Sequence, residues 1–354
     1  MNSIGERLRL TTFGESHGPA IGGVLDGYPA GIHIDFDYIA SEMSRRRPGQ
    51  SRITTGRHEQ DEVEFLSGIL DGVSTGTPIA FIIRNNDCNT ADYDELRYVF
   101  RPSHADYTYQ IKYGIRDWRG GGRASGRVTI PICVAGALAR LALEKRVSDL
   151  DIYAFTSQIG DICTDVEDEM SFSREDSEAS IVRCPDADKS AEMEDLLWEL
   201  KQDGDSIGGT VTCIIRGCPA GVGEPVFDKL HARLGSAMLG INAVKGFEYG
   251  DGFGCAAMRG SECNDAFITD GNDGITTLTN HSGGIQGGIS NGQPIRFRVA
   301  FKPTPTIAMS QQTVTVDGVP TTLEASGRHD PCIVPRAVPV VENLAALVLA
   351  DFLL

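Results

Sequence analysis

The spacing of the apolar residues changes along the chain, and this change limits the fold more than any other feature of the sequence. Residues 32–36 alternate between apolar and polar, which predicts a strand, and residues 36–43 then follow the i, i+3, i+4, i+7 spacing of a helix face. Asp35 can cap this helix and Pro48 can end it. Residues 295–301 return to strand alternation. Such mixing without a regular strand–helix repeat predicts an α+β fold.

Further segments fit this fold, and neither a linker nor an internal repeat divides the chain. We therefore expect one large domain over residues 1–354. A helix entered at Pro131 has a face of small residues around Gly136, which permits close packing against a neighbour. The other predicted elements are strands over 8–13, 21–25, 78–84 and 207–216, and helices over 105–115, 129–146, 193–200, 227–241 and from Pro339 onward.

The charge of the chain is acidic and unevenly distributed. With 49 Asp and Glu against 32 Lys and Arg, the net charge is −17. Sixteen acidic and four basic residues lie between Asp161 and Asp205, which predicts a solvated acidic surface segment at about 161–205. Because a nucleic-acid-binding protein normally carries a basic excess, this class of function is disfavoured.

The cysteine, histidine and apolar patterns argue against a metal site, a disulfide framework and a membrane helix. The nine Cys residues form no C-x-x-C pair, and no two His residues have a spacing such as H-x-x-x-H. We therefore expect reduced thiols and no metal site. The first ten residues contain no hydrophobic signal region, and no uncharged apolar run reaches about 18 residues. These features predict a cytoplasmic protein without a membrane helix.

Two stretches combine Arg with Gly or Pro: R-G-G-G-R-A-S-G-R at 119–127 and R-R-R-P-G-Q-S-R at 45–52. Glycine lets the backbone approach a ligand closely, and guanidinium groups bind phosphate and carboxylate through forked donors. The stretches can form either a solvated basic face or a pocket for a small polyanion. The acidic total charge and the lack of aromatic residues among the Arg residues favour the pocket.

Several polar clusters are expected to meet at one site, since such loops usually carry function on a rigid scaffold. The chain lacks both G-x-x-x-x-G-K-[ST] and a strand followed by G-x-G-x-x-G, so a phosphate-bearing cofactor would be held in another way. His17 and His104 are candidate proton donors. Each also has a structural interpretation, His17 as a turn residue and His104 as a helix-start residue. The clusters lie at 14–18, 45–57, 101–107, 119–127 with 302–306, and 327–330.

Eight motifs, in order and over nearly the whole chain, resemble the chorismate synthase family. Each motif alone is weak, but eight in register are highly specific. They are T-F-G-E-S-H-G at 12–18, R-R-R-P-G-Q-S-R at 45–52, R-P-S-H-A-D-Y-T at 101–108, R-G-G-G-R-A-S-G-R at 119–127, I-N-A-V-K-G at 241–246, G-G-I-Q-G-G-I-S-N-G at 283–292, K-P-T-P-T-I at 302–307 and G-R-H-D-P-C at 327–332.

The resemblance implies a carbon–oxygen lyase of the shikimate pathway, which leads to aromatic amino acids. Members of the family convert 5-enolpyruvylshikimate 3-phosphate to chorismate and phosphate by an anti 1,4-elimination, and they require reduced FMN. The resemblance further implies a β-α-β sandwich of helices and antiparallel sheets, a homotetramer, a small-molecule substrate and neither a nucleic-acid nor a membrane partner. The anionic groups of substrate and FMN agree with the Arg-rich stretches.

The resemblance also implies roles for individual residues. His17 corresponds to the acid near the leaving phosphate, and Ser16 to a relay. His104 corresponds to the group that sets the protonation of the reduced flavin, and Asp330 to the carboxylate that works with flavin N5. Expected FMN contacts are Arg123, Ala124, Ser125, Asn242, Ala243, Gly287, Lys302, Pro303, Thr304, Pro305, Thr306 and Arg328. Expected substrate contacts are Arg45, Arg46, Arg52 and Arg127.

Two positions depart from the family pattern, and two functional alternatives stay open. Val128 stands where Glu is usual, which removes a local partner of Arg127, and Pro305 stands where Ser is frequent. One alternative is a bifunctional enzyme that reduces its own flavin with NADPH. The other is a non-catalytic module that binds polyanions through its Arg residues, in which a His104→Ala change would leave function unaltered.

Overall fold

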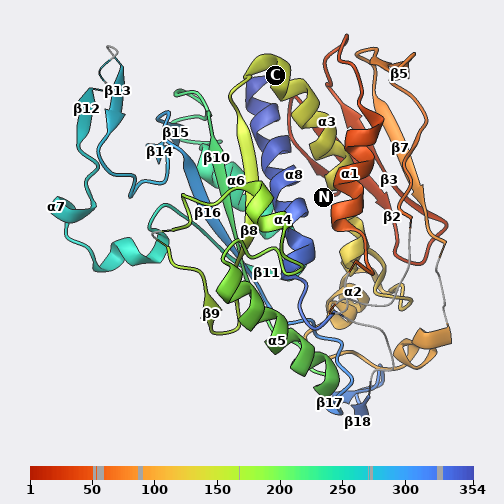
Figure 1. The fold of residues 1–354 in the computed structure, drawn as a ribbon. Coiled ribbons are helices and arrows are strands. Elements are labelled where there is room, and N and C mark those ends of the chain that lie inside the picture. Colours follow the sequence, from red (N-terminus) through yellow and green to blue (C-terminus); the bar gives the residue numbers. More distant parts are fainter. Residues whose placement is uncertain are drawn as a thin grey trace.

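Two antiparallel five-stranded sheets form the outer layers of the fold, and helices fill the space between them (Figure 1). The computed structural model describes residues 1–50, 53, 60–86, 91–166, 168–269, 271, 274–324 and 330–354. The first sheet has the order β1 (Ser3–Ile4), β2 (Arg9–Gly14), β3 (Ala20–Asp26), β7 (Ile79–Arg84) and β4 (Glu64–Phe65). The second has the order β11 (Val244–Tyr249), β16 (Ile295–Phe301), β10 (Gly209–Arg216), β8 (Asp151–Ile159) and β9 (Ile162–Cys163).

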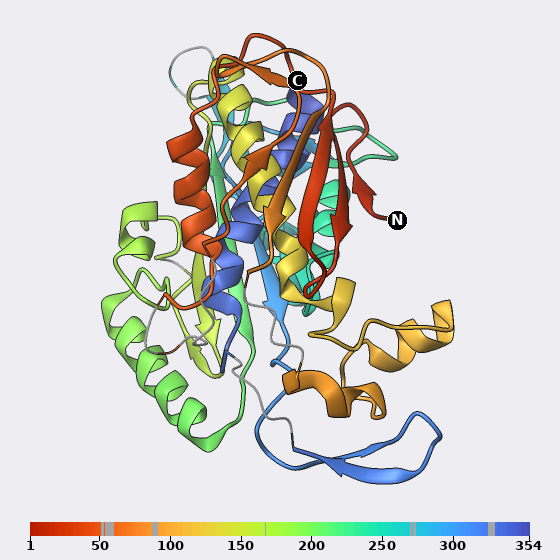
Figure 2. The same cartoon turned by 90° about the vertical axis from the view of Figure 1, so that its right-hand side faces the viewer.

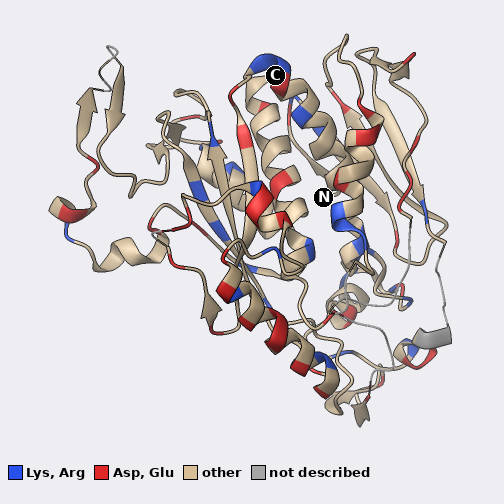
Figure 3. Cartoon of the chain, viewed as in Figure 1, with Lys and Arg blue, Asp and Glu red and all other residues tan. Residues whose placement is uncertain are grey.

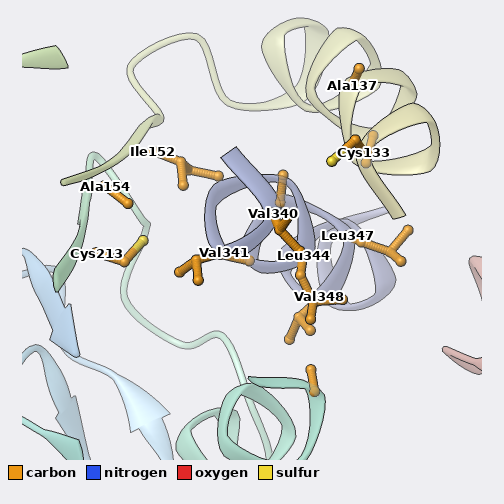
Figure 4. Close-up of a cluster of buried hydrophobic side chains, with 14 of the residues drawn as sticks. Cys133, Ala137, Ile152, Ala154, Cys213, Val340, Val341, Leu344, Leu347 and Val348 are labelled. Atoms are coloured by element: carbon orange, nitrogen blue, oxygen red, sulfur yellow. The ribbon is translucent and has the colours of Figure 1, made fainter. Parts of the chain in front are cut away.

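The helices α1 (Phe36–Arg46), α3 (Ile130–Arg146) and α8 (Val334–Leu353) make up the inner layer. α3 packs on β2 and β3 of the first sheet, α8 packs on β8 and β10 of the second, and the two helices pack on each other. Figure 4 shows apolar side chains of α8 between α3 and the second sheet. The predicted α+β sandwich is therefore confirmed.

The remaining elements lie at the margins of the sandwich. Figure 2 shows the hairpin of β17 (Gln311–Val314) and β18 (Pro320–Leu323) extending beyond the helical layer, next to η1 (Ala91–Arg97). The other hairpins are β5 (Ile69–Leu70) with β6 (Val73–Ser74), β12 (Phe267–Thr269) with β13 (Ile275–Thr277) and β14 (Ile285–Gln286) with β15 (Ile289–Ser290). The other helices are α2 (Asp106–Tyr113), α4 (Arg174–Glu178), α5 (Ala187–Asp203), α6 (Leu230–Leu239) and α7 (Gly260–Cys263), with 3₁₀ turns η2 (Gly122–Ala124), η3 (Gly126–Thr129) and η4 (Gly252–Ala257).

The last helix begins earlier than its sequence pattern predicts. The prediction placed its start at Pro339, but α8 begins at Val334, with Pro335 in its first turn and Pro339 inside it. An internal proline has no N–H for the carbonyl four residues earlier, which here is that of Pro335. The guanidinium of Arg183 donates to this carbonyl oxygen at 2.6 Å. The side chain replaces the missing backbone donor, so the helix continues through Pro339.

Two failures of strand prediction have opposite reasons. Residues 32–36 alternate as a strand would, yet His33 makes only an isolated bridge to Val73. Asp151–Ile159 forms a central strand that the alternation rule missed, because the consecutive residues 152–157 are all buried. A strand covered on both faces shows no polar alternation. The other predicted strands and helices are present, with shifted ends.

The inner helix α3 is apolar because protein surrounds it. Among the described helices, only the segment Gly126–Arg146 has the length and composition of a membrane span, and 72% of that apolar window is buried. Its small-residue face meets α8: a Cβ on Gly136 would lie 2.3 Å from the backbone oxygen of Asn343. The predicted close packing around Gly136 therefore occurs against α8.

The acidic segment at 161–205 lies on the outside of the second sheet, and α5 carries much of its charge (Figure 3). The side chains of Asp195 and Glu199 on α5 are exposed, as expected for a solvated face. Glu169 is an exception, because its carboxylate is buried and accepts from Arg296 Nε at 2.7 Å and from Thr212 Oγ1 at 3.1 Å. One acidic residue of the segment therefore stabilises the sheet from its outer face.

Candidate active site

A cavity of about 890 Å³ lies beside the first turns of α3 and α8, where loops from distant parts of the chain meet. This volume is in the range of small-molecule binding sites, about 300–1,000 Å³. One part of the lining is polar and mostly cationic: Ser16, Arg46, Arg101, His104, Arg123, Arg127, Lys302, Asp330 and Arg336. The other part is an apolar lobe between α3, α6 and α8, formed by Ile132, Ala237, Ile241, Ile333, Ala337, Val340 and Leu344.

Two adjacent glycines of the Arg- and Gly-rich stretch each lie against one of the two predicted histidines. A Cβ on Gly120 would lie 2.2 Å from Cε1 of His17, and a Cβ on Gly121 would lie 2.9 Å from Cε1 of His104. Both glycines have positive φ, 59° and 89°, which residues with a Cβ rarely adopt. Glycine is therefore required here for close approach as well as for backbone shape.

His17 lies one layer behind the cavity surface, and Ser16 lies on it. The imidazole is buried, stacks edge-on against Tyr93 at 4.9 Å and is 3.1 Å from Ser16 Oγ through Nδ1. Ser16, Tyr93 and Gly120 line the cavity, whereas His17 does not. The Ser16 hydroxyl is thus a polar atom that connects His17 with the cavity.

His104 lines the cavity directly and is held by a carboxylate. Its Nδ1 is 2.9 Å from Oδ1 of Asp106, which also accepts from Nη2 of Arg101 at 2.8 Å. Pro102 and Ser103 are the central residues of the turn before His104, and Ser103 has a φ of 56°. Burial lowers the pKa of His104, and it outweighs the opposing effect of Asp106. The imidazole is therefore neutral at neutral pH.

The loops predicted to hold the cofactor are joined by hydrogen bonds. Asn242 Nδ2 donates to the backbone oxygen of Ala124 at 2.6 Å, and Lys302 N donates to the backbone oxygen of Ala243 at 3.0 Å. Ala243 has a φ of 70°, in the left-handed region. Such strain is uncommon in residues with a Cβ and concentrates at ligand sites. The three loops therefore form one wall of the cavity.

Two arginines of the polar part share a buried carboxylate. Asp61 lies 3.5 Å from Nη1 of Arg46 and 3.1 Å from Nη2 of Arg127. Burial, together with the charges of Arg336 and Arg127, lowers the pKa of Arg46 to about 10, so it stays a cation at neutral pH. Arg127 thus has Asp61 as an ionic partner although Val128 replaces the usual Glu beside it. One carboxylate between two guanidinium groups leaves a net positive charge next to the cavity.

Asp330 and Arg336 form an ion pair at the cavity wall, with Asp330 mostly buried. Thr304 Oγ1 donates to the backbone oxygen of Asp330 at 3.4 Å. The loop at 302–306 and the segment before α8 are thereby fixed to each other. Arg336, from the first turns of α8, was missed by the sequence analysis because it lies outside all eight motifs.

Most of the residues predicted for the site reach the cavity, and a smaller group does not. His17, Arg45, Gly287 and Pro303 are absent from its lining, and Gly287 lies in the turn between β14 and β15. Arg52 and Arg328 lie outside the described residues. The predicted residues on the lining are Ser16, Arg46, His104, Arg123, Ala124, Ser125, Arg127, Asn242, Ala243, Lys302, Thr304, Pro305, Thr306 and Asp330.

Arg45 points away from the cavity because consecutive residues of a helix project in different directions, and Arg46 is the one that faces the cavity. Its guanidinium pairs with Glu342 at 2.7 Å, with Glu178 at 2.7 Å and with Glu42 at 3.0 Å. Glu342 is fully buried on α8 and also pairs with Arg174 at 3.0 Å. Arg45 therefore belongs to an ionic network inside the helical layer, which the Arg-rich motif alone did not reveal.

Sequence reasoning also missed Asp106, Asp61 and the apolar lobe. Asp106 is inside the quoted motif at 101–108, two residues after His104, and that spacing could have drawn attention to it. Asp61 and the apolar lobe carry no local signal. Among the described residues, no group of three or more His, Cys, Asp or Glu side chains is arranged to hold a metal ion.

A cavity that combines buried cations, a histidine on its wall, a second histidine behind that wall and an apolar lobe defines an enzyme for a small anionic substrate. A sequence profile named chorismate synthase matches residues 8–354. The chain belongs to the chorismate synthase family, whose members are lyases.

Similar proteins agree with this assignment over their full lengths. The chorismate synthase of Parabacteroides distasonis is 60% identical over 359 residues, which cover 100% of this chain and 98% of the relative. That of Bacteroides fragilis is 58% identical over 353 residues, with the same coverage of 100% and 98%. A crystal structure of chorismate synthase superimposes with a TM-score of 0.77 at 31% identity, covering 99% of this chain and 92% of that one.

Proposed function

We propose that this chain converts 5-enolpyruvylshikimate 3-phosphate to chorismate and phosphate with reduced FMN in the same cavity. The observation that carries the proposal is the composition of that cavity. One space joins an apolar lobe, a set of cations and the hydroxyl, imidazole and carboxylate groups of Ser16, His104 and Asp330. Membership of the family supports the reaction, and the cavity offers both an apolar and an anionic binding region for it.

The described residues fit a flavin phosphate. The apolar lobe between α3, α6 and α8 suits a flat ring system, and the wall formed by the 124–125, 242–243 and 302–306 segments offers hydroxyls and cations for a phosphate. Arg123 fixes this wall by donating to Thr12 Oγ1 at 2.7 Å and to the backbone oxygen of Gly14 at 3.1 Å. Reduced FMN, when bound, supplies an electron to the substrate and takes up the ring hydrogen.

In this proposal the anionic groups of the substrate bind to the cations that pair with Asp61 and Asp330. Arg46, Arg127 and Arg336 line the cavity and are held by those two carboxylates, so little conformational entropy is lost when an anion binds. Two carboxylates and a phosphate need several such donors in a site from which water is excluded.

Two residues, His17 and Ser16, together supply the proton for the leaving phosphate in this proposal. His17 does not line the cavity, but its Nδ1 is 3.1 Å from Ser16 Oγ, which does. Ser16 can donate its hydroxyl proton to the phosphate oxygen as the carbon–oxygen bond breaks and regain one from His17. Ser16→Ala and His17→Gln should then lower phosphate release to a similar extent.

Anaerobic release of phosphate from 5-enolpyruvylshikimate 3-phosphate with chemically reduced FMN tests the proposal. We expect multiple turnovers and one chorismate for each phosphate. A folded protein that binds the flavin and releases no phosphate would disprove it. Adding NADPH and oxidised FMN in place of reduced FMN tests the bifunctional alternative, since only a chain that reduces its own flavin would then turn over.

We also propose that the chain assembles as a homotetramer, as the family resemblance implies, and that it is cytoplasmic, as its cysteine and N-terminal patterns predict. The β12–β13 hairpin and the neighbouring turn η4 project from the body of the fold (Figure 1). Phe253, Phe267 and Ile275 in this projection expose 84%, 68% and 75% of their surface, and such apolar side chains are typical of subunit contacts. Light scattering of the purified protein would give the mass of a single chain if this proposal is wrong.

A further inference from the structure

Asp106 is a buried carboxylate next to the cavity, and it contacts Arg101, His104 and Arg116. It is the first residue of α2 and only 3% exposed. Oδ2 accepts from the backbone N of Arg101 at 3.1 Å and from its Nε at 2.8 Å, and Oδ1 accepts from Arg101 Nη2 at 2.8 Å. Arg116 Nη1 lies 3.6 Å from Oδ1. The carboxylate is therefore ionised and cannot rotate away from these donors.

One contact of this carboxylate reaches a residue of the cavity. His104 Nδ1 lies 2.9 Å from Asp106 Oδ1. Arg101 keeps Asp106 ionised, and an ionised carboxylate only accepts hydrogen bonds, so Nδ1 carries the hydrogen. In the neutral ring the lone pair is then on Nε2, which is 3.0 Å from the position of a Cβ on Gly121.

The cations around Asp106 offset its charge but leave its hydrogen bond to His104 in place. An isolated carboxylate beside a histidine would favour the imidazolium form. Here Arg101 and Arg116 balance the negative charge of Asp106, and the positive charge of Lys302, on another loop, further disfavours protonation of the ring. The hydrogen bond to Nδ1 remains, whereas the electrostatic pull toward protonation is reduced.

We propose that Asp106 is the positioning residue of the active site: it fixes His104 as the Nδ1–H tautomer and presents Nε2 to the cavity as a hydrogen-bond acceptor. Asp106 acts through His104 and does not line the cavity. This inference rests on the proposed function for its effect on turnover, but the tautomer itself is a property of the resting protein.

Asp106→Asn tests the inference, because the amide has nearly the same shape and can present either its oxygen or its NH₂ group to Nδ1. We expect kcat to fall on the order of 10²-fold or more, as for loss of acid–base catalysis, with KM and FMN affinity changed less than about three-fold. We also expect the acidic limb of the pH profile to move to lower pH, because the cations Arg101 and Arg116 lose their counter-charge. Asp106→Glu should recover part of kcat.

A matched control is Asp117→Asn, which removes a carboxylate that pairs with Arg119 at 2.8 Å and, among the described residues, forms no hydrogen bond or ion pair with His17 or His104. Its kcat and pH profile should equal those of the wild type. If Asp106→Asn keeps both the wild-type kcat and the wild-type pH limb, or lowers the melting temperature and FMN affinity without moving the pH limb, the positioning role is disproved.

Nitrogen-15 spectra of the resting protein give a test that does not depend on turnover. With the seven histidines labelled and His104 assigned from a His104→Gln variant, we expect its Nδ1 to show a protonated shift and its Nε2 an unprotonated one near pH 7.5. The opposite pattern would overturn the inference even if the enzyme is active. If the protein releases no phosphate but shows the expected pattern, the proposed function fails and the tautomer assignment stands.

Discussion

The backbone of Asn343 on α8 lies so close to Gly136 on α3 that a side chain at Gly136 has no room. A Cβ there would lie 2.3 Å from the backbone oxygen of Asn343 and 2.4 Å from its Cβ. We expect Gly136→Ala to lower the free energy of unfolding by about 3 kcal/mol or more, since neither helix backbone can move without disturbing a sheet. Thermal and urea unfolding measure the loss. Gly254→Ala, where no atom of the described residues lies within 4 Å of the added Cβ, should have little effect.

Gly121 should matter for turnover more than for stability. An alanine there would place its Cβ 2.9 Å from Cε1 and 3.0 Å from Nε2 of His104. We expect kcat to fall by about 10²-fold, as for a displaced catalytic group. Gly114→Ala is the matched control, because its φ of 73° imposes a similar backbone cost and the part of the chain that the structure describes places no atom within 4 Å of the added Cβ. Equal kcat values for the two variants would contradict the prediction.

The neighbours Arg45 and Arg46 should respond differently to the same change. Arg46→Gln removes a cation from the cavity lining, and we expect KM for the substrate to rise about ten-fold or more. Arg45→Gln leaves Glu342 without its nearest partner, and we expect the free energy of unfolding to fall by about 3 kcal/mol with KM unchanged. Steady-state kinetics on both variants decide the matter: a raised KM in Arg45→Gln would return Arg45 to the substrate site.

Glu342 should make stability depend on pH in the acidic range. Three arginines, Arg45, Arg174 and Arg140, outweigh the cost of its burial and lower its pKa from 4.5 to about 2. A lowered pKa stabilises the fold above the unfolded-state pKa, and this contribution is lost as the pH falls toward the folded-state value. The difference in unfolding free energy between the wild type and Glu342→Gln should therefore be constant from pH 7 to about pH 5 and shrink below about pH 4.5. A constant difference down to pH 3 would exclude this titration.

The sequence predicted elements whose apolar residues face one side, and it failed where burial is uniform or a contact is remote. The helix capped by Asp35 and the strand at 295–301 have one buried face, so their period was visible. Asp151–Ile159 is covered on both faces, so its sequence shows no alternation of apolar and polar residues that would predict a strand. The start of α8 depended on Arg183, which lies 152 residues from Pro335. No local pattern can contain such a donor.

The site was predictable to the extent that its residues lie in motifs. His104, Asp330 and the loop at 302–306 were found through the resemblance, and the structure brings them to one cavity. Arg45 and Arg46 could not be told apart, because one residue of helix rotation decides whether a side chain meets Glu342 or the cavity. Asp61 could not be found at all, since its role depends on two arginines that are distant in the sequence.

The position of α8 has a consequence for how the chain folds during synthesis. Residues 334–353 cover the inner face of the second sheet and the buried side of α3, and the Asp351 carboxylate accepts from the backbone N–H groups of Glu6, Arg7 and Leu8 at 2.7–3.0 Å. Every strand of both sheets leaves the ribosome before this helix does. Until α8 is synthesised, the inner face of the second sheet and one side of α3 stay uncovered, so the nascent chain is at greatest risk of aggregation until this last helix is in place.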